Sequence, residues 1–432
     1  MRVMYTPVRN RPGDLGGKPL ELTGWRRIDP NVTMLGLTSM FTDLASEMVT
    51  SILPLYLTLT FGFSLVQFGA FDGLYQGMAA LTGLWAALFA DRRRRYKEVA
   101  VAGYGLSAVS RLGLILARSW APVVGLLYVD RLGKGVRTAP RDALISLSST
   151  RARLAESFGL HRAMDTAGAV AGPIVASLLL SQNPTGYRSV FVCSFFASCI
   201  GLGVLVFFVQ NRRGEPDPGA ESSTRVSIRT ALALLADRRF TAVLAVAVVL
   251  GLVVPGDSLI YLTYAKQTDL APGFFPLLFA GASIGFLLLA VPLGRLADRV
   301  GRARVFVAGQ VMLFGVFALL GAGLGGLAPL LLMLLLYGGF YAATDGIIAA
   351  MASSVLPRHL RTTGLAILGT SVAVAHLLSA IGWGAIWQVW GIDAATRAFM
   401  AGLLVSIVVG IVLLRPGGHT TSSAEPASAG RP

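Results

Sequence analysis

The chain has 432 residues, of which 54% are hydrophobic and only 14% are charged, whereas soluble domains carry roughly 25% charged residues. This composition excludes a soluble globular protein. Because 54% of 432 residues is about 233, and a membrane-spanning helix uses about 20 apolar residues, the chain has enough for about twelve spans. The net charge of +15 is therefore interpreted relative to a membrane, and nucleic acid is not expected as a partner.

The first half of the chain contains six apolar runs. Residues 1–30 are polar and basic and lack an apolar core, so we expect a cytoplasmic segment and not a secretory signal. The runs cover 32–60, 67–90, 99–117, 121–146, 156–180 and 188–210, and we assign residues 31–210 to an N-terminal six-helix bundle. Residues 211–239 predict a cytoplasmic linker with a surface amphipathic helix over Val226–Phe240.

The second half repeats this organisation. Apolar runs cover 240–265, 274–297, 305–325, 328–352, 361–390 and 395–414, which we assign to a C-terminal bundle over 240–415. A disordered cytoplasmic tail is expected over 416–432. Because alternate connections are rich in arginine and lysine, the positive-inside rule predicts that both termini and the linker are cytoplasmic. We therefore expect a multi-pass protein of the inner (plasma) membrane, surrounded by membrane lipid.

Two short loops of the same pattern follow the second and the eighth apolar runs, displaced by 207 residues (298 minus 91). The later loop contains Gly294, Asp298, Arg299, Gly301 and Arg302, and the earlier loop contains Asp91, Arg92 and Arg95, with Ala87 and Arg94 at the glycine positions. This pattern resembles the GxxxDRxGRxx loop of the major facilitator superfamily, and the resemblance extends from Asn31 to Arg415.

The resemblance implies an all-α membrane protein whose twelve transmembrane helices form two pseudosymmetric six-helix bundles and transport by alternating access. It also implies that the two loops gate the cytoplasmic side. Since glycine permits a tight turn with positive φ, we expect the first loop to be less sharply bent. For this first loop, charges that only set membrane topology remain an alternative.

Two further patterns carry the same resemblance. The fourth run reads DRLGKGVRTAPRD from Asp130 to Asp142, which is similar to a prokaryotic branch with a DRxGKGxRxxPRD signature. Gly168, Gly172 and Pro173 form part of a GxxxGP pattern associated with exporters, although Ala176 and Ser177 replace its last two glycines. The favoured alternative is that these small residues simply pack or hinge helices, a role that extends to Gly133 and Gly135 of the fourth run.

An ionisable residue within a span is expected to have a charged partner, to face a water-filled passage or to serve a function, because placing a charge near the bilayer centre costs free energy. Asp43 and Glu47 are four residues apart and share one helix face. Two carboxylates this close disfavour joint ionisation, so we expect the pair to load and release a proton. The alternative is a purely structural pair neutralised by Arg111, Arg131 or Lys134.

The fourth span contributes a charged face. Asp130 and Lys134 share this face, and Asp130 and Arg131 are expected near the membrane midplane. Arg131 suits either binding of an anionic group or holding Asp130 or Asp43 ionised. Arg137, Arg141 and Asp142 are expected near the cytoplasmic end as topological or gate residues, while Asp165 can pair with Arg162 or with fourth-span charges.

The second half has fewer ionisable residues, so we expect proton chemistry in the first half and a more apolar cavity in the second. The candidates for this cavity are Asp257, Tyr261, Tyr341, Asp345 and His376, with Tyr264, Tyr337, Trp383 and Trp387 as further aromatic residues. Two plainer readings are favoured here: aromatic side chains ordinarily mark membrane interfaces, and His376 alone is more often a packed polar residue.

These patterns favour a monomeric secondary transporter that exports a small amphipathic organic molecule in exchange for protons. The alternative within this fold is an importer or exchanger of an organic anion bound by Arg111, Arg131 and Lys134. A non-transporting receptor or a membrane enzyme with the same architecture is an alternative from a different functional class. The sequence shows no nucleophile and base constellation and no metal-ligand spacing, so we expect no enzyme, no metal and no cofactor.

Overall fold

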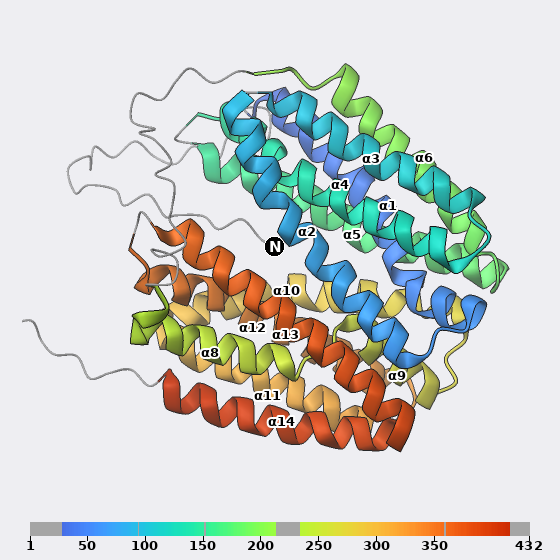
Figure 1. Ribbon diagram of the computed structural model, residues 1–432, viewed down its shortest axis with the longest axis vertical. Helices are drawn as coiled ribbons and strands as arrows, with labels where there is room; N and C mark the ends of the chain where they lie inside the picture. The colour runs from blue at the N-terminus through green and yellow to red at the C-terminus, as the bar shows by residue number, and fades with distance from the viewer. Residues whose placement is uncertain (1–27, 94, 151–152, 213–233, 358–359, 415–432) are drawn as a thin grey trace, which may run out of the picture.

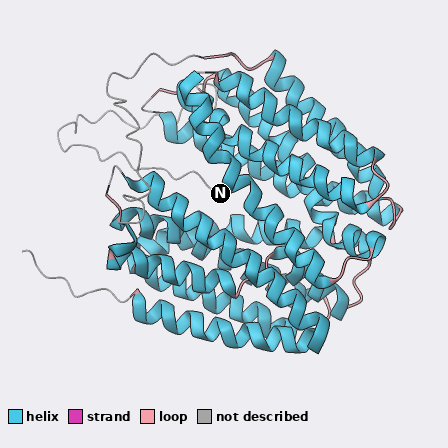
Figure 2. Ribbon diagram, viewed as in Figure 1, coloured by secondary structure: helices cyan, strands magenta, loops and turns pink. Residues whose placement is uncertain are grey.

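The computed structural model describes residues 28–93, 95–150, 153–212, 234–357 and 360–414, and this part of the chain is almost entirely helical (Figure 2). The helices of the first half are α1 (Pro30–Leu55) with a π-helical continuation η2 (Tyr56–Thr60), α2 (Leu65–Arg93), α3 (Tyr96–Leu116), α4 (Trp120–Leu147), α5 (Leu154–Gln182) and α6 (Tyr187–Phe207). Those of the second half are η4 (Leu234–Ala236), α8 (Arg238–Leu252), α9 (Asp257–Gln267), η5 (Pro272–Phe274), α10 (Pro276–Val300), α11 (Arg302–Gly321), α12 (Leu327–Val355), α13 (Arg361–Trp390) and α14 (Ile392–Leu413).

The helices form twelve spans, with α8 and α9 together making the seventh, which confirms the predicted all-α membrane architecture. In the described part of the chain, nine helical segments are long and apolar enough to cross a membrane. The fourth span is not among them because α4 carries six charged residues between Asp130 and Asp142. Most of the helix expected over Val226–Phe240, and nearly all of the terminal segments, lie outside the described residues.

The seventh span, predicted over 240–265, is present but its helix is interrupted. The span breaks between α8 and α9, where Pro255 has no N–H to donate and Gly256 has a φ of +92°. The break frees the carbonyl group of Val254, which lies 3.1 Å from Nδ1 of His376 on α13. The start of α9 therefore presents its unpaired backbone N–H groups inside the molecule.

The two halves form separate bundles, α1–α6 and α8–α14 (Figure 1). We call the end where α6 ends and α8 begins the linker end, and the end where α1 gives way to α2 the distal end. The ribbons of α2 and α13 run close together near the distal end and diverge toward the linker end (Figure 1).

Close approaches between the bundles lie in the distal half. A Cβ atom at Gly69 would overlap the carbonyl oxygen of Ala380, and one at Gly73 would lie 2.7 Å from Cα of Leu377, so α2 and α13 pack backbone to backbone. The hydroxyl of Ser177 on α5 donates to the carbonyl oxygen of Gly273 on η5 at 2.6 Å. The structure is therefore closed at its distal end.

Candidate transport site

Charged side chains from α1, α3, α4 and α5 gather inside the first bundle, in what we call the polar core. Its members are Asp43, Glu47, Arg111, Asp130, Arg131, Lys134, Arg137, Arg141 and Asp165. The i, i+4, i+7 spacing along α4 directs its charges toward α1 and α3, because residues at these intervals share one helix face. Ion pairs join eight of these members two by two, and Arg131 donates instead to the hydroxyl of Thr50, so each charge has a partner as expected in a membrane interior.

Arg111 and Asp130 form the most buried ion pair of the polar core. Nη2 of Arg111 lies 3.1 Å from Oδ1 of Asp130, and the arginine side chain is only 1% exposed. The same guanidinium donates to the hydroxyls of Ser46 and Ser198, each at 2.7 Å. Arg111 thus joins α3 to α1, α4 and α6 and has few donors left for a substrate.

Asp43 and Glu47 share one face of α1 but have different basic partners. Oδ1 of Asp43 lies 3.6 Å from Nη2 of Arg137, and Oε1 of Glu47 lies 3.9 Å from Nζ of Lys134. Two separate ion pairs therefore stand where the sequence suggested a single carboxylate pair. Glu47 and Lys134 are the least buried members of the polar core, with side chains 23% and 30% exposed.

Arg137 was expected near the cytoplasmic end of the fourth span as a topological or gate residue, and the structure shows that its side chain is buried. Its side chain is 2% exposed, donates to the hydroxyl of Ser107 at 2.9 Å, and lies with Cζ 4.8 Å from the ring centroid of Tyr104. Helical spacing gives the position of a residue along the span, but it does not say how deeply its side chain is buried between neighbouring helices. Arg137 is a second buried cation facing α1.

Asp165 connects α5 to this cluster. Its carboxyl group lies 3.9 Å from Nη1 of Arg141 and 3.3 Å from Nη1 of Arg162. Asp165 therefore contacts both kinds of partner that the sequence suggested. Asp165 is also an electrostatic neighbour of Asp43, and joint ionisation of two neighbouring carboxyl groups is unfavourable because it brings two negative charges together.

Arg131 lies in the middle of the bundle against an aromatic ring. Its Cζ atom is 3.8 Å from the ring centroid of Tyr75, and its Nη2 donates to the hydroxyl of Thr50 at 3.2 Å. Its Nε is buried without a hydrogen-bond partner in the described part of the chain. The geometry is that of a cation held mainly by an aromatic face.

Asp72 on α2 is a buried carboxylate that sequence reasoning missed. It accepts a hydrogen bond from the Ser258 hydroxyl at 3.1 Å, and its Oδ2 lies 3.1 Å from where a Cβ of Gly256 would be. A carboxylate of the first bundle thus faces the N-terminal end of α9 in the second bundle, which favours negative charge. The available signal was a single acidic residue inside an otherwise apolar run.

The second bundle contributes one compact polar group. Asp257 accepts a hydrogen bond from the Tyr337 hydroxyl at 2.8 Å and another from the Tyr341 hydroxyl, and the two hydroxyl oxygens are 3.3 Å apart. Tyr261 does not line a cavity, because it is 1% exposed and packs edge-on against Tyr337. His376 faces the helix break as described above, and Asp345 lies farther along α12 and is exposed.

Two of the other aromatic candidates also belong to the packed core. Trp383 is fully buried between Phe317 and Phe399, at centroid distances of 5.7 and 4.8 Å. Trp387 is 6% exposed, with Nζ of Lys266 5.5 Å from its ring centroid. Neither residue lines an apolar cavity.

The later of the two repeated loops is fully described. Gly301 has a φ of +102° and separates α10 from α11, which is the sharp turn that the pattern requires. Asp298 and Arg302 lie 4.0 Å apart on the exposed surface, and Gly294 and Arg299 belong to the last turns of α10. In the earlier loop Arg95 is exposed, whereas the side chains of Asp91 and Arg92 lie outside the described residues.

Three of the glycines singled out in the fourth and fifth spans lie at helix contacts. A Cβ at Gly133 would lie 2.7 Å from the Gly103 carbonyl oxygen on α3, and one at Gly172 would lie 2.6 Å from the Leu44 carbonyl oxygen on α1. Gly168 approaches α1 in the same way, at the Met40 carbonyl oxygen. Gly135 and Pro173 are buried within α4 and α5.

No group of three or more metal-ligating side chains is found among the described residues.

The family model of the Major Facilitator Superfamily matches residues 35–268 and 256–431. The chain belongs to the Major Facilitator Superfamily. It is therefore a membrane transporter and not an enzyme.

Similar proteins agree with this assignment. The chain is 29% identical over 397 residues to an uncharacterised MFS-type transporter of Methanocaldococcus jannaschii, covering 90% of this chain and 95% of that protein. It is 27% identical over 294 residues to the multidrug resistance protein MdtG of Dickeya zeae, covering 66% of this chain and 69% of that protein. The fold matches the crystal structure of a POT family transporter in complex with 5-aminolevulinic acid, with a TM-score of 0.75, 12% identity and coverage of 90% and 96%.

Proposed function

We propose that this transporter is a monomeric proton-coupled antiporter that exports a small amphipathic organic molecule across the plasma membrane, with its linker end in the cytoplasm. The observation that carries the proposal is the partly exposed Glu47–Lys134 ion pair, beside the Asp43–Arg137 ion pair and the nearby carboxyl group of Asp165. Proton exchange requires carboxyl groups that can take up and release a proton. It also requires an ion pair that breaks when its carboxylate is neutralised.

In this mechanism a proton competes with the ion pairs that hold α1 to α4. Protonation of Glu47 removes its attraction to Lys134, and protonation of the Asp43–Asp165 pair weakens the contact with Arg137. Looser contacts between these helices favour a rearrangement of the bundle, and substrate binding re-forms them as the proton leaves. Rocking of the two bundles around a central site then exposes that site alternately to each side.

Export and amphipathic cargo have two supports. The relative named a multidrug resistance protein aligns over two thirds of the chain. The Asp257, Tyr337 and Tyr341 group of the second bundle offers a carboxylate and two hydroxyls among aromatic rings. A ligand with an apolar body and a hydrogen-bond donor suits that group.

The experiment uses purified protein in liposomes under an imposed pH gradient, with proton flux recorded in the same vesicles during a screen of small amphipathic compounds. The double variant Asp43→Asn, Glu47→Gln should lose pH-gradient-driven transport while remaining monodisperse and helical. The matched control is Asp269→Asn, because Asp269 lies outside the polar core and its φ of +48° suits asparagine equally well. Full coupling in the double variant would remove the proposal.

Anion import is the competing function, and its proposed binding cluster is only partly available. Arg111 is already occupied by Asp130, Ser46 and Ser198, which leaves Arg131 and Lys134. Replacing Arg131 by glutamine separates the two functions. Loss of anion binding would favour import, whereas normal substrate binding with altered pH dependence would favour antiport.

A further inference from the structure

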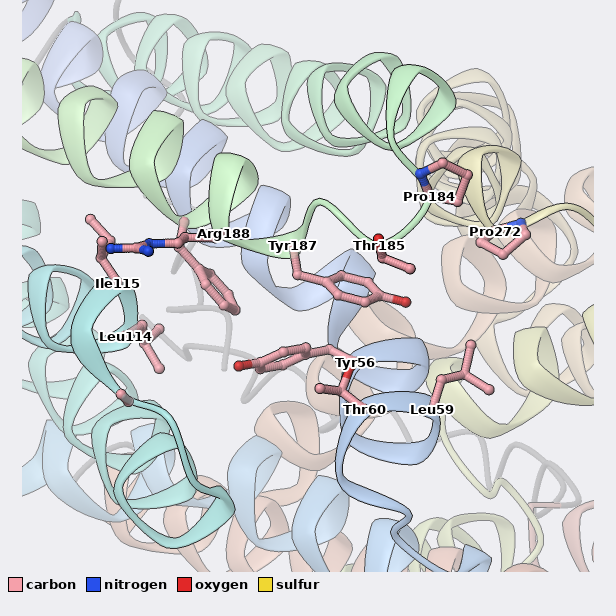
Figure 3. Close-up of a pocket in the computed structure, with 12 residues that line it drawn as sticks. Tyr56, Leu59, Thr60, Leu114, Ile115, Pro184, Thr185, Tyr187, Arg188 and Pro272 are labelled. Carbon is pink, nitrogen blue, oxygen red and sulfur yellow. The ribbon is translucent and has the colours of Figure 1, made fainter.

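A pocket of about 490 Å³ lies at the distal end, away from the polar core. It is bordered by η2, by the end of α3 and by the start of α6, and Pro272 of η5 contributes from the second bundle (Figure 3). Tyr56 and Tyr187 lie side by side within it, with ring centroids 5.1 Å apart. The proton-coupling proposal uses none of these residues.

Among the polar groups that line the pocket, those of Tyr56, Tyr187 and the exposed Arg188 have no hydrogen-bond partner in the described part of the chain, whereas the Thr185 hydroxyl donates to Asn183. Arg188 forms no ion pair and no hydrogen bond with any part of the chain that the structure describes. The hydroxyls of Tyr56 and Tyr187 likewise have no partner among these residues, and neither oxygen is sealed from solvent. Because no acidic side chain lines the pocket, the unpaired arginine gives it a positive potential.

Apart from Thr60 and Thr185, the rest of the pocket wall is apolar. Leu114 and Phe191 are each only 2% exposed and form its inner side. The π-helical turn of η2 borders the pocket and carries Tyr56 into it. Such turns are uncommon and often mark functional sites. An exposed cation at the edge of a largely apolar wall matches a ligand that has an anionic head and an apolar body.

We propose that the distal pocket binds an anionic amphiphile, with a phosphate-type head on Arg188 and the apolar portion against Leu114, Phe191 and the ring of Tyr56. The hydroxyls of Tyr56 and Tyr187 point in opposite directions (Figure 3), so the charge of Arg188 holds the head. The pocket is complete only when η5 approaches the first bundle, because Pro272 is one of its walls. The Ser177–Gly273 hydrogen bond forms at the same contact. Occupancy therefore stabilises the state that is closed at the distal end.

The test uses the purified full chain in a neutral detergent, with dodecyl phosphate and phosphatidylglycerol as probes and dodecyl maltoside as the uncharged reference. Wild-type protein should bind both anionic probes, and Arg188→Gln should weaken binding about tenfold, as expected for loss of a charge-assisted hydrogen bond. Arg188→Lys should retain most of the affinity. The matched control is Arg397→Gln, since Arg397 is an exposed arginine near the start of α14 and lies outside the pocket.

The outcomes distinguish binding in the pocket from a general attraction of anions to the protein. They also distinguish a membrane lipid from a free amphiphile as the ligand. Equal weakening by Arg188→Gln and Arg397→Gln, or equal binding by Arg188→Gln and wild type, would overturn the proposal. Tighter binding of phosphatidylglycerol assigns the pocket to a membrane lipid, and tighter binding of dodecyl phosphate assigns it to a free amphiphile. Arg188→Gln must remain monodisperse, and retained affinity in Arg188→Lys shows that the loss in Arg188→Gln comes from the missing charge.

Discussion

Replacing Asp130 by asparagine should destabilise the first bundle, because it strands the charge of Arg111. The arginine side chain is 1% exposed, so it cannot regain water, and its ion-pair partner lies 3.1 Å away. Breaking a buried ion pair from one side costs about 3–5 kcal/mol. Asparagine keeps a neutral acceptor, and the hydrogen bonds to Ser46 and Ser198 remain at 2.7 Å. We therefore expect the lower end of that range, about 3 kcal/mol.

The assay is equilibrium unfolding in mixed micelles, followed by circular dichroism and tryptophan fluorescence. A double-mutant cycle isolates the pair, because Arg111→Met combined with Asp130→Asn removes both charges. The double variant should be more stable than the sum of the single losses predicts, by at least about 1 kcal/mol. A loss below about 1 kcal/mol in Asp130→Asn would refute the reasoning, since that magnitude is typical of exposed ion pairs.

Two further substitutions test the distal closure and the repeated loop. Gly73→Leu should hold the distal end open, because even a Cβ would lie 2.7 Å from the facing helix backbone, and spin labels on α2 and α13 should report a longer distance. Gly105→Leu is the matched control with no atom within 4 Å of its Cβ, and an unchanged distance in both variants would contradict the closure. Gly301→Ala should cost about 1–3 kcal/mol because of its positive φ, whereas Gly294→Ala, with open space around its Cβ, should stay within about 0.5 kcal/mol in the same unfolding assay.

Several features of the fold were readable in advance. Hydropathy placed the twelve spans, since any segment crossing lipid must satisfy its own backbone and present apolar side chains. The loop repeated after the second and eighth spans indicated two equivalent halves and the correct family. The break of the seventh span was also signalled, because Pro255 and Gly256 adjoin inside an apolar run.

The partners of the buried charges were not predictable in the same way. Helical periodicity showed that Asp43 and Glu47 share a face, but not that Arg137 meets the first and Lys134 the second. Asp72 had no charged neighbour along its own helix, and its partner Ser258 lies 186 residues away in the other bundle. Trp383 and Tyr341 are both aromatic residues within apolar runs. Trp383 is nevertheless buried in the packed core, whereas Tyr341 donates a hydrogen bond to Asp257.

The sequence by itself determined the number of spans, the equivalence of the halves and the residue types that carry charge into the membrane, because these depend on local composition and spacing. Only the tertiary structure decided which charges pair, which aromatic rings are buried, and that a pocket with an unpaired arginine forms at the distal end. The physical reason is that pairing and burial depend on how neighbouring helices rotate and cross, and contacts far apart along the chain control both.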